Sequence, residues 1–382
     1  MTFPVRTYIN SPHGLVALGP EHALLPLPWG LDGEGPALTY GPYFDALLSF
    51  LSQRDYQPLR AALGGLLQQP IPLRKIQGVE VISQKHGAFY HVAQVRSNIA
   101  GVHYSFVVNS AVRPAQQAFL ESEFALLQDL AERFPLGFVP HAFALGTAPC
   151  TTGDGIACSL KSFIAEWFEG YHEFHLSRQD SQGDLFIKVW DAHSGNSLLD
   201  AEEARSVYHQ AALILTAYLD PESFSQIYPW HHAAGDFVLK RLGAGPQLRL
   251  ITVRGYLPLV TVGPDPSEKW IPLVHFFLNL SLRMRLDRLD GTGELVWADP
   301  DCLAGVVSGF VEGWEQKTKK HPALPRTSEV MAVLRSFTPE EWLPLASLVL
   351  DHGLVETDES EFIEPRLEEH ATSLHKILCE HG

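Results

Sequence analysis

The chain has 382 residues, of which 46% are hydrophobic and 19% charged, a balance that excludes a disordered chain and provides for a large core. Its 28 Lys and Arg against 44 Asp and Glu give a net charge of −16, which would repel a phosphate backbone, so nucleic-acid binding is not expected. This length predicts two lobes and an appendage rather than one average domain.

The location of the protein is predicted from what the sequence omits. No run of about 18 uninterrupted apolar residues is present, so no membrane partner is expected. The start, residues 1–14, has no basic stretch followed by an apolar run, so no secretory signal is expected. The four cysteines, at 150, 158, 302 and 379, form no CxxC pair and are interpreted as free thiols in a reducing compartment. We therefore predict a cytoplasmic protein.

The first half of the chain predicts a sheet after a short helical region. Residues 1–40 are rich in Pro and Gly, and apolar residues at helical spacing in 43–67 predict two short helices that end at Pro70 and Pro72. Valine, isoleucine and aromatic residues then mark antiparallel strands within 79–95 and 103–112. A helix over 116–134 and strands over 138–146 and 159–166 complete a predicted five-stranded sheet, which one helix interrupts after its third strand.

The second half is predicted to be mainly helical. Acidic residues open a helix over 200–219, and a strand pair follows over 236–239 and 248–253. Further helices are predicted over 270–289, 299–317, 327–335, 338–352 and 360–379. The predicted divisions are an N-terminal extension with short helices (1–74), a small β-rich lobe (75–168), a helical lobe (169–317) and a C-terminal helical appendage (318–382), which could pack on the helical lobe or mediate dimerisation.

Three segments carry a resemblance to a known family. Residues 86–93, His-Gly-Ala-Phe-Tyr-His-Val-Ala, lie at the turn between the first two strands. Residues 163–170, Phe-Ile-Ala-Glu-Trp-Phe-Glu-Gly, end the last strand of the sheet, and 231–237 read His-His-Ala-Ala-Gly-Asp-Phe. Their order and spacing resemble the nucleotide-covering loop, the hinge and the His-Gly-Asp loop of aminoglycoside and choline kinases, with two alanines inserted in the last. The resemblance covers roughly residues 75–317.

The resemblance implies a fold and a set of site residues. The fold is α+β, a two-lobed protein-kinase-like fold with a small antiparallel five-stranded lobe and a larger, mainly helical lobe. Asp236 matches the catalytic aspartate, whose alternative role is to orient the loop by hydrogen bonds to backbone amides. The residues expected to contact a nucleotide, of which ATP is the one the family implies, are His86, Gly87, Glu166, Phe168, Arg241 and Arg254.

Several residues that phosphoryl transfer needs are replaced. A kinase lysine on the third strand pairs with a glutamate of the next helix, and two further side chains hold magnesium. Asn109 stands where the lysine is expected, although Lys85 or Lys161 could take its place, and Glu121 or Glu123 could be the partner glutamate. Arg241 and Arg254 stand where the metal ligands are expected. These arginines could bind a phosphate or carboxylate but not Mg²⁺.

A dense group of acids and imidazoles follows the proposed hinge. Glu169, His172 and Glu173 would share one face of a helix, which is the spacing that metal ligands use, with His175 close by. The alternative is a helix start with polar residues on its solvent face. Adjacent His231 and His232 are likewise interpreted as structural rather than ligating.

Three functions are compatible with these patterns. The first is a kinase-like protein that binds a nucleotide or another phosphate-bearing ligand and is catalytically weak or inactive. The second is an active small-molecule phosphotransferase with rearranged metal ligands, which would need a second carboxylate near Asp236, such as Glu166 or Asp265. The third is a non-enzymatic scaffold whose cleft is filled by a bulky side chain such as Phe89 or Tyr90.

Overall fold

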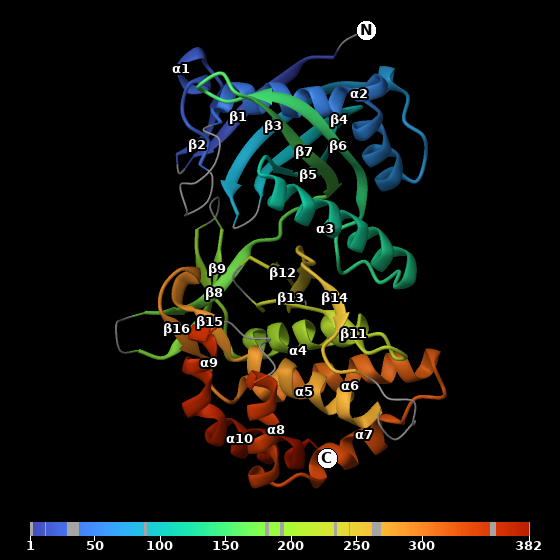
Figure 1. Ribbon diagram of the computed structural model, residues 1–382, viewed down its shortest axis with the longest axis vertical. Coiled ribbons are helices and arrows are strands. Elements are labelled where there is room, and N and C mark those ends of the chain that lie inside the picture. Colours follow the sequence, from blue (N-terminus) through green and yellow to red (C-terminus); the bar gives the residue numbers. More distant parts are fainter. Residues whose placement is uncertain are drawn as a thin grey trace. The chain divides into compact units, whose positions relative to one another are not determined.

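The computed structural model describes residues 3–11, 13–28, 38–87, 90–179, 183–191, 195–232, 235–243, 245–261, 269–351 and 357–381. The chain divides into two compact units, Met1–Glu169 and Gly170–Gly382, and the fold is α+β, as expected (Figure 1). Asp265 and Phe89, together with Ala88, Ala233 and Ala234, lie outside the described residues. Every helix in the described part of the chain is too short or too polar to cross a bilayer.

The first unit is built on a seven-stranded mixed sheet with the order β2-β1-β3-β4-β5-β7-β6. Its strands are β1 (Val5–Ser11), β2 (Gly14–Ala17), β3 (Ile76–His86), β4 (His91–Ile99), β5 (Val102–Ala111), β6 (Ala142–Thr151) and β7 (Ala157–Glu166). The five predicted strands are confirmed, but the expectation of a purely antiparallel five-stranded sheet is wrong. The N-terminal segment supplies two more strands, and β1 runs parallel to β3, with Val5 opposite Val79.

Helices cover both faces of this sheet (Figure 1). The helix α2 (Tyr40–Leu67) packs its apolar side chains on the face that carries Phe106, Val108 and Ile164. Non-helical backbone at residues 53–56 divides α2 into two parts, which confirms the two predicted short helices. The helix α3 (Pro114–Arg133) packs on the opposite face, where the rings of Phe124 and Phe163 lie 5.9 Å apart. A short helix, α1 (Pro20–Ala23), precedes α2.

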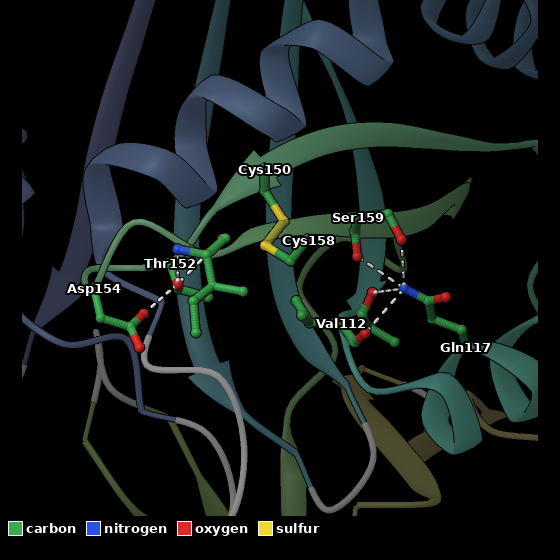
Figure 2. The surroundings of a disulfide bond; sticks show 9 residues. Val112, Gln117, Cys150, Thr152, Asp154, Cys158 and Ser159 are labelled. Atoms are coloured by element: carbon green, nitrogen blue, oxygen red, sulfur yellow. Dashed lines mark hydrogen bonds between the residues drawn. A yellow bond between two sulfur atoms is a disulfide. The ribbon is translucent and has the colours of Figure 1, made fainter.

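A disulfide joins β6 to β7 near their connecting turn (Figure 2). Cys150 and Cys158 are opposite each other in the antiparallel register, with Cα atoms 5.0 Å apart, so their side chains meet on one face of the sheet. The prediction of four free thiols is therefore wrong for this pair. Spacing along the chain does not show cross-strand register, which is why counting CxxC pairs missed it. Cys302 and Cys379 are free.

Within its described residues, the second unit contains four small sheets. Their strands are β8 (Glu173–Arg178), β9 (Leu185–Trp190), β10 (Ser197–Leu198), β11 (Ser225–Ile227), β12 (Phe237–Leu242), β13 (Gly245–Leu250), β14 (Tyr256–Pro258), β15 (Leu286–Arg288) and β16 (Leu295–Trp297). The order is β10-β9-β8 in the first, and β11-β14, β12-β13 and β15-β16 pair as the others. The predicted strand pair is confirmed as β12 and β13, whereas the other strands were not predicted.

Helices form most of the second unit. They are α4 (Ala201–Ala217), α5 (Trp270–Arg283), α6 (Cys302–Lys320), α7 (Thr327–Ser336), α8 (Pro339–Asp351), α9 (Thr357–Ile363) and α10 (Leu367–Glu380). Asp200 caps α4 by accepting a hydrogen bond from the Glu203 backbone, while the Glu203 side chain returns to the Asp200 backbone. The helix predicted over 360–379 is two helices, because Pro365 interrupts the pattern.

Candidate functional site

The predicted site residues are distributed over both units. His86, Gly87, Glu166 and Phe168 belong to the first, and Asp236, Arg241 and Arg254 belong to the second. The His86 backbone ends β3 and pairs with His91 beyond an irregularity in the register. The exposed Gly87 donates its backbone N–H to the Tyr90 carbonyl at 2.9 Å, which joins the end of β3 to the start of β4.

The segment expected to be a hinge continues directly from β7. The Glu166 backbone N–H donates to the His141 carbonyl at 2.9 Å, and the Glu166 carboxylate lies 3.5 Å from the His141 backbone nitrogen. Phe168 is half-buried just after the strand. Glu166 is thus held at the end of β7, an inner strand between β5 and β6.

The loop before β12 holds Asp236 in a fixed orientation. Gly235 has a φ of +82°, a conformation that glycine adopts at low cost, and Asp236 follows it directly. The Asp236 side chain is 1% exposed, and its Oδ2 accepts a hydrogen bond from the His231 backbone N–H at 2.8 Å. Its carbonyl accepts another from Ile251 at 2.8 Å. The Asp236 carboxylate thus makes a backbone hydrogen bond of the kind that its structural interpretation implies.

Arg254 is bound to the same carboxylate. Its Nη1 lies 2.6 Å from Asp236 Oδ2 and its Nη2 lies 2.5 Å from Oδ1, a bidentate arrangement. The guanidinium thus neutralises the buried carboxylate from the position where the family resemblance implies a metal ligand. These residues do not fit a magnesium ion, because the loop carboxylate already has a cation on both oxygens.

Arg241 lies apart from this pair. Its Nε and Nη2 bind Glu203 Oε1 and Oε2 at 2.9 and 2.7 Å, and its Nη1 lies 3.4 Å from Ser197 Oγ. The side chain is 44% exposed. Both predicted cationic contacts are therefore occupied by carboxylates of the chain, and the structure brings only Arg254 together with Asp236.

A second carboxylate reaches the loop from α9. The Nε2 of His231 lies 3.0 Å from Glu359 Oε1, and its Nδ1 lies 3.8 Å from Asp236 Oδ2, so the imidazole stands between two acids. Arg283 Nη1 lies 3.7 Å from the other Glu359 oxygen. Burial acts to raise the pKa of Glu359, but the hydrogen bond and charge of His231, together with the charge of Arg283, lower it overall.

His232 points into a different environment. It is 1% exposed and packs against Tyr208, with the two rings 5.3 Å apart. Burial, which disfavours the charged imidazole, lowers its pKa to about 4. A histidine kept neutral in this way packs as a core residue, in agreement with its structural interpretation.

A helix-to-sheet ion pair lies in the first unit. Lys161 on β7 contacts Glu121 on α3. Lys161 is opposite Ala111 in the register, and Phe163 is opposite Asn109, so all four side chains leave the same face of the sheet. Lys161 thus lies diagonally across from Asn109, the residue of β5 at which the family resemblance implies a lysine. Of the two proposed partners, Glu121 makes this contact, and Glu123 is buried on α3.

The segment proposed as a metal cluster is not helical. Glu173 begins β8, and His172 forms an isolated bridge with Leu239 on β12. The helical face that would have gathered Glu169, His172 and Glu173 is therefore absent, and His172 lies 3.6 Å from Asp191. Among the described residues, no group of three or more His, Cys, Asp or Glu side chains is arranged to hold a metal ion.

A surface pocket of about 360 Å³ lies elsewhere in the first unit, between β1 and α2. Phe3, Val79 and Tyr56 give it apolar walls, and Asp45 and Ser49 add polar groups. It contains none of the predicted site residues, so it is separate from the site that the sequence indicated.

Glu359 and Arg283, which surround His231 in the loop before β12, were not predicted from the sequence. Glu359 lies 128 residues after His231 in the chain. Arg283 donates to the Tyr228 hydroxyl at 2.8 Å, although both are far apart in sequence. The only available signal was the acidic character of the C-terminal segment, which did not indicate a target.

Neither models of known protein families nor curated protein sequences give a match to this chain.

Proposed function

We propose that this chain is a kinase-like protein that binds a nucleotide or another phosphate-bearing ligand and does not transfer phosphate efficiently. The observation that carries the proposal is the bidentate pair of Asp236 with Arg254. A catalytic-loop carboxylate has to accept or orient the proton of a substrate hydroxyl. The carboxylate of Asp236 is buried, and a guanidinium and a backbone amide already occupy its oxygens.

The sheet of the first unit supports the kinase-like part of the proposal. Five of its strands have a helix after the third, the layout that the family resemblance implies. Lys161 and Glu121 form a strand-to-helix ion pair of the chemical type that kinases use to place a phosphate-binding lysine. This pair also favours the second candidate, an active phosphotransferase, because it supplies the cation that the third strand lacks.

The test is thermal unfolding of the full chain with ATP, ADP and GTP, each with and without magnesium. A nucleotide at 100 times its dissociation constant adds about 2.7 kcal/mol to the free energy of unfolding, so the melting temperature rises measurably. We expect stabilisation that does not need magnesium. Stabilisation only with magnesium would instead favour the active phosphotransferase, and no shift with any nucleotide would favour a scaffold.

A matched pair of variants ties the result to the proposed residues. Lys161→Met removes the sheet cation, whereas Lys376→Met removes an exposed lysine on α10 with a similar side chain. We expect the nucleotide-induced shift to decrease in the first variant and to remain in the second. Equal shifts in both variants would exclude Lys161 as a ligand contact.

A further inference from the structure

Acidic residues of α9 contact Arg283, the last residue of α5, and Arg288, the last residue of β15. Asp358 Oδ2 accepts from Arg288 Nη2 at 2.7 Å, and Glu359 Oε2 lies 3.7 Å from Arg283 Nη1. Two adjacent acids therefore face two cations that are close together in the chain. The two acids and the two arginines belong to the same compact unit.

Glu359 takes the place that an oxyanion would occupy. One oxygen is 3.0 Å from His231 Nε2, and the other faces Arg283. An imidazole and a guanidinium around two oxygens are groups that bind phosphate as readily as carboxylate. The Glu359 side chain is 4% exposed, so it is buried between these two groups.

The attachment of α9 is largely ionic. The helix has seven residues, of which only Glu359 and Ile363 are buried. Asp358 is half exposed, and its pair with Arg288 is open to solvent. An element with so little buried apolar surface has a low free energy of local opening, and salt or a competing anion weakens its ionic contacts.

We propose that α9 is an intramolecular anionic ligand. Glu359 occupies an anion-binding position between His231 and Arg283, Asp358 occupies the guanidinium of Arg288, and a phosphate-bearing molecule replaces these carboxylates when it binds. The proposal rests on the proposed function for the class of its ligand, and it gives the second unit a phosphate-binding site of its own, separate from the Lys161 contact of the first unit. His231 also donates its backbone N–H to Asp236. Replacement of α9 by a ligand therefore changes the contacts of a residue that holds the Asp236 loop.

The experiment compares three forms of the full chain: the wild type, Asp358→Asn, and Asp358→Asn combined with Glu359→Gln. Glu368→Gln, an exposed acid in the first turn of α10, is the matched control. Pyrophosphate and ATP are the probes, and calorimetry measures their affinity. We expect the double variant to bind pyrophosphate about tenfold more tightly than the wild type, with a smaller gain in Asp358→Asn and none in the control.

Hydrogen exchange at 357–363 gives a second readout. We expect pyrophosphate to increase exchange there in the wild type, because the ligand displaces α9. Unchanged exchange together with equal affinities in all forms would overturn this inference, while nucleotide stabilisation of the wild type would leave the proposed function intact. Absence of binding in every form would overturn both. If the double variant fails to fold, the affinity of Asp358→Asn for pyrophosphate decides the test, because the exposed pair of Asp358 with Arg288 contributes little to stability.

Discussion

At the loop before β12, Asp236 and Arg254 each satisfy the charge of the other. Taking two ions out of water costs several kcal/mol per ion, and their attraction offsets this cost only with good geometry and additional hydrogen bonds. Asp236 has both, since Arg254 binds it through two nitrogens and His231 adds a backbone N–H. The pair therefore fixes the loop, and removal of either partner leaves a poorly solvated charge.

We predict strong coupling between these two residues in a double-mutant cycle. Asp236→Asn and Arg254→Gln should each lower the free energy of unfolding, and their interaction energy should be about 2 kcal/mol. The control cycle is Glu203→Gln with Arg241→Gln, also a bidentate pair but with an arginine side chain that is 44% rather than 16% exposed. Its coupling should stay below about 1 kcal/mol, as measured by urea unfolding. Equal coupling in both cycles would contradict the buried character of the first pair.

Two buried histidines make stability depend on pH. Burial lowers the pKa of His232 to about 4 and that of His370 to about 3, the latter with a further effect of the Arg285 charge. An exposed histidine has a pKa of about 6.5, so below that pH the unfolded chain binds more protons than the folded one. We predict that the free energy of unfolding falls as pH falls from about 6.5 to 4, by up to about 1.4 kcal/mol per pH unit for each histidine.

Urea unfolding at a series of pH values checks this prediction. His370→Gln keeps a hydrogen-bonding group near Ser281, whose Oγ lies 3.1 Å from the imidazole Nε2, and removes the titrating ring. We expect this variant to show a shallower dependence on pH than the wild type. His321→Gln, which removes an exposed histidine, should leave the slope unchanged. A wild-type stability that is constant over this window would show that neither histidine contributes.

At the scale of elements, a glycine row sets the approach of α6 to α4. Gly305, Gly309 and Gly313 recur every four residues and therefore lie on one face of α6. A Cβ at Gly309 would stand 2.0 Å from the His209 carbonyl oxygen on α4, and one at Gly305 would stand 2.6 Å from the Arg205 carbonyl oxygen. The helices α4 and α6 can pack this closely only because Gly305 and Gly309 have no side chain.

We predict that Gly309→Ala lowers the free energy of unfolding by about 2 kcal/mol. Helix propensity alone would make alanine more favourable by about 1 kcal/mol, but the backbone of α4 has to move to admit the methyl group, and such overpacking costs about 1–3 kcal/mol beyond that gain. Gly243→Ala is the control, because nothing lies within 4 Å of its added Cβ and its φ is not positive. A stabilised Gly309→Ala variant would mean that α4 and α6 separate freely.

At the scale of the whole molecule, the secondary structure followed from local patterns in most places. The β3–β4–β5 run, α3 and the β12–β13 pair lie where periodicity placed them, since each has apolar residues at the spacing of its own element. The strand β9, Leu-Phe-Ile-Lys-Val-Trp, has an apolar pattern typical of a strand but was not predicted, and β8 and β10 are short and contain polar residues. The first strand, β1, pairs in parallel with β3, and the chain between them covers more than 60 residues.

The candidate site was predictable only in part. Asp236 was singled out because residues 231–237 resemble a His-Gly-Asp loop, whereas the strand that follows it was predicted from its apolar residues. The occupation of Asp236 by Arg254 could not be predicted, since it depends on where β13 leads the chain after its pairing with β12. The same holds for Lys161 with Glu121, which are joined by the register of β5 with β7 rather than by proximity in sequence.

By itself, the sequence determined the α+β class and most of the helices and central strands, because backbone preference and apolar periodicity act over a few residues. Only the tertiary structure decided that β1 and β2 extend the sheet, that Cys150 and Cys158 are bonded, and that Arg254 and Glu359 converge on the loop. These are contacts between remote segments. They depend on strand register and on charges brought together by burial, and no local pattern contains either.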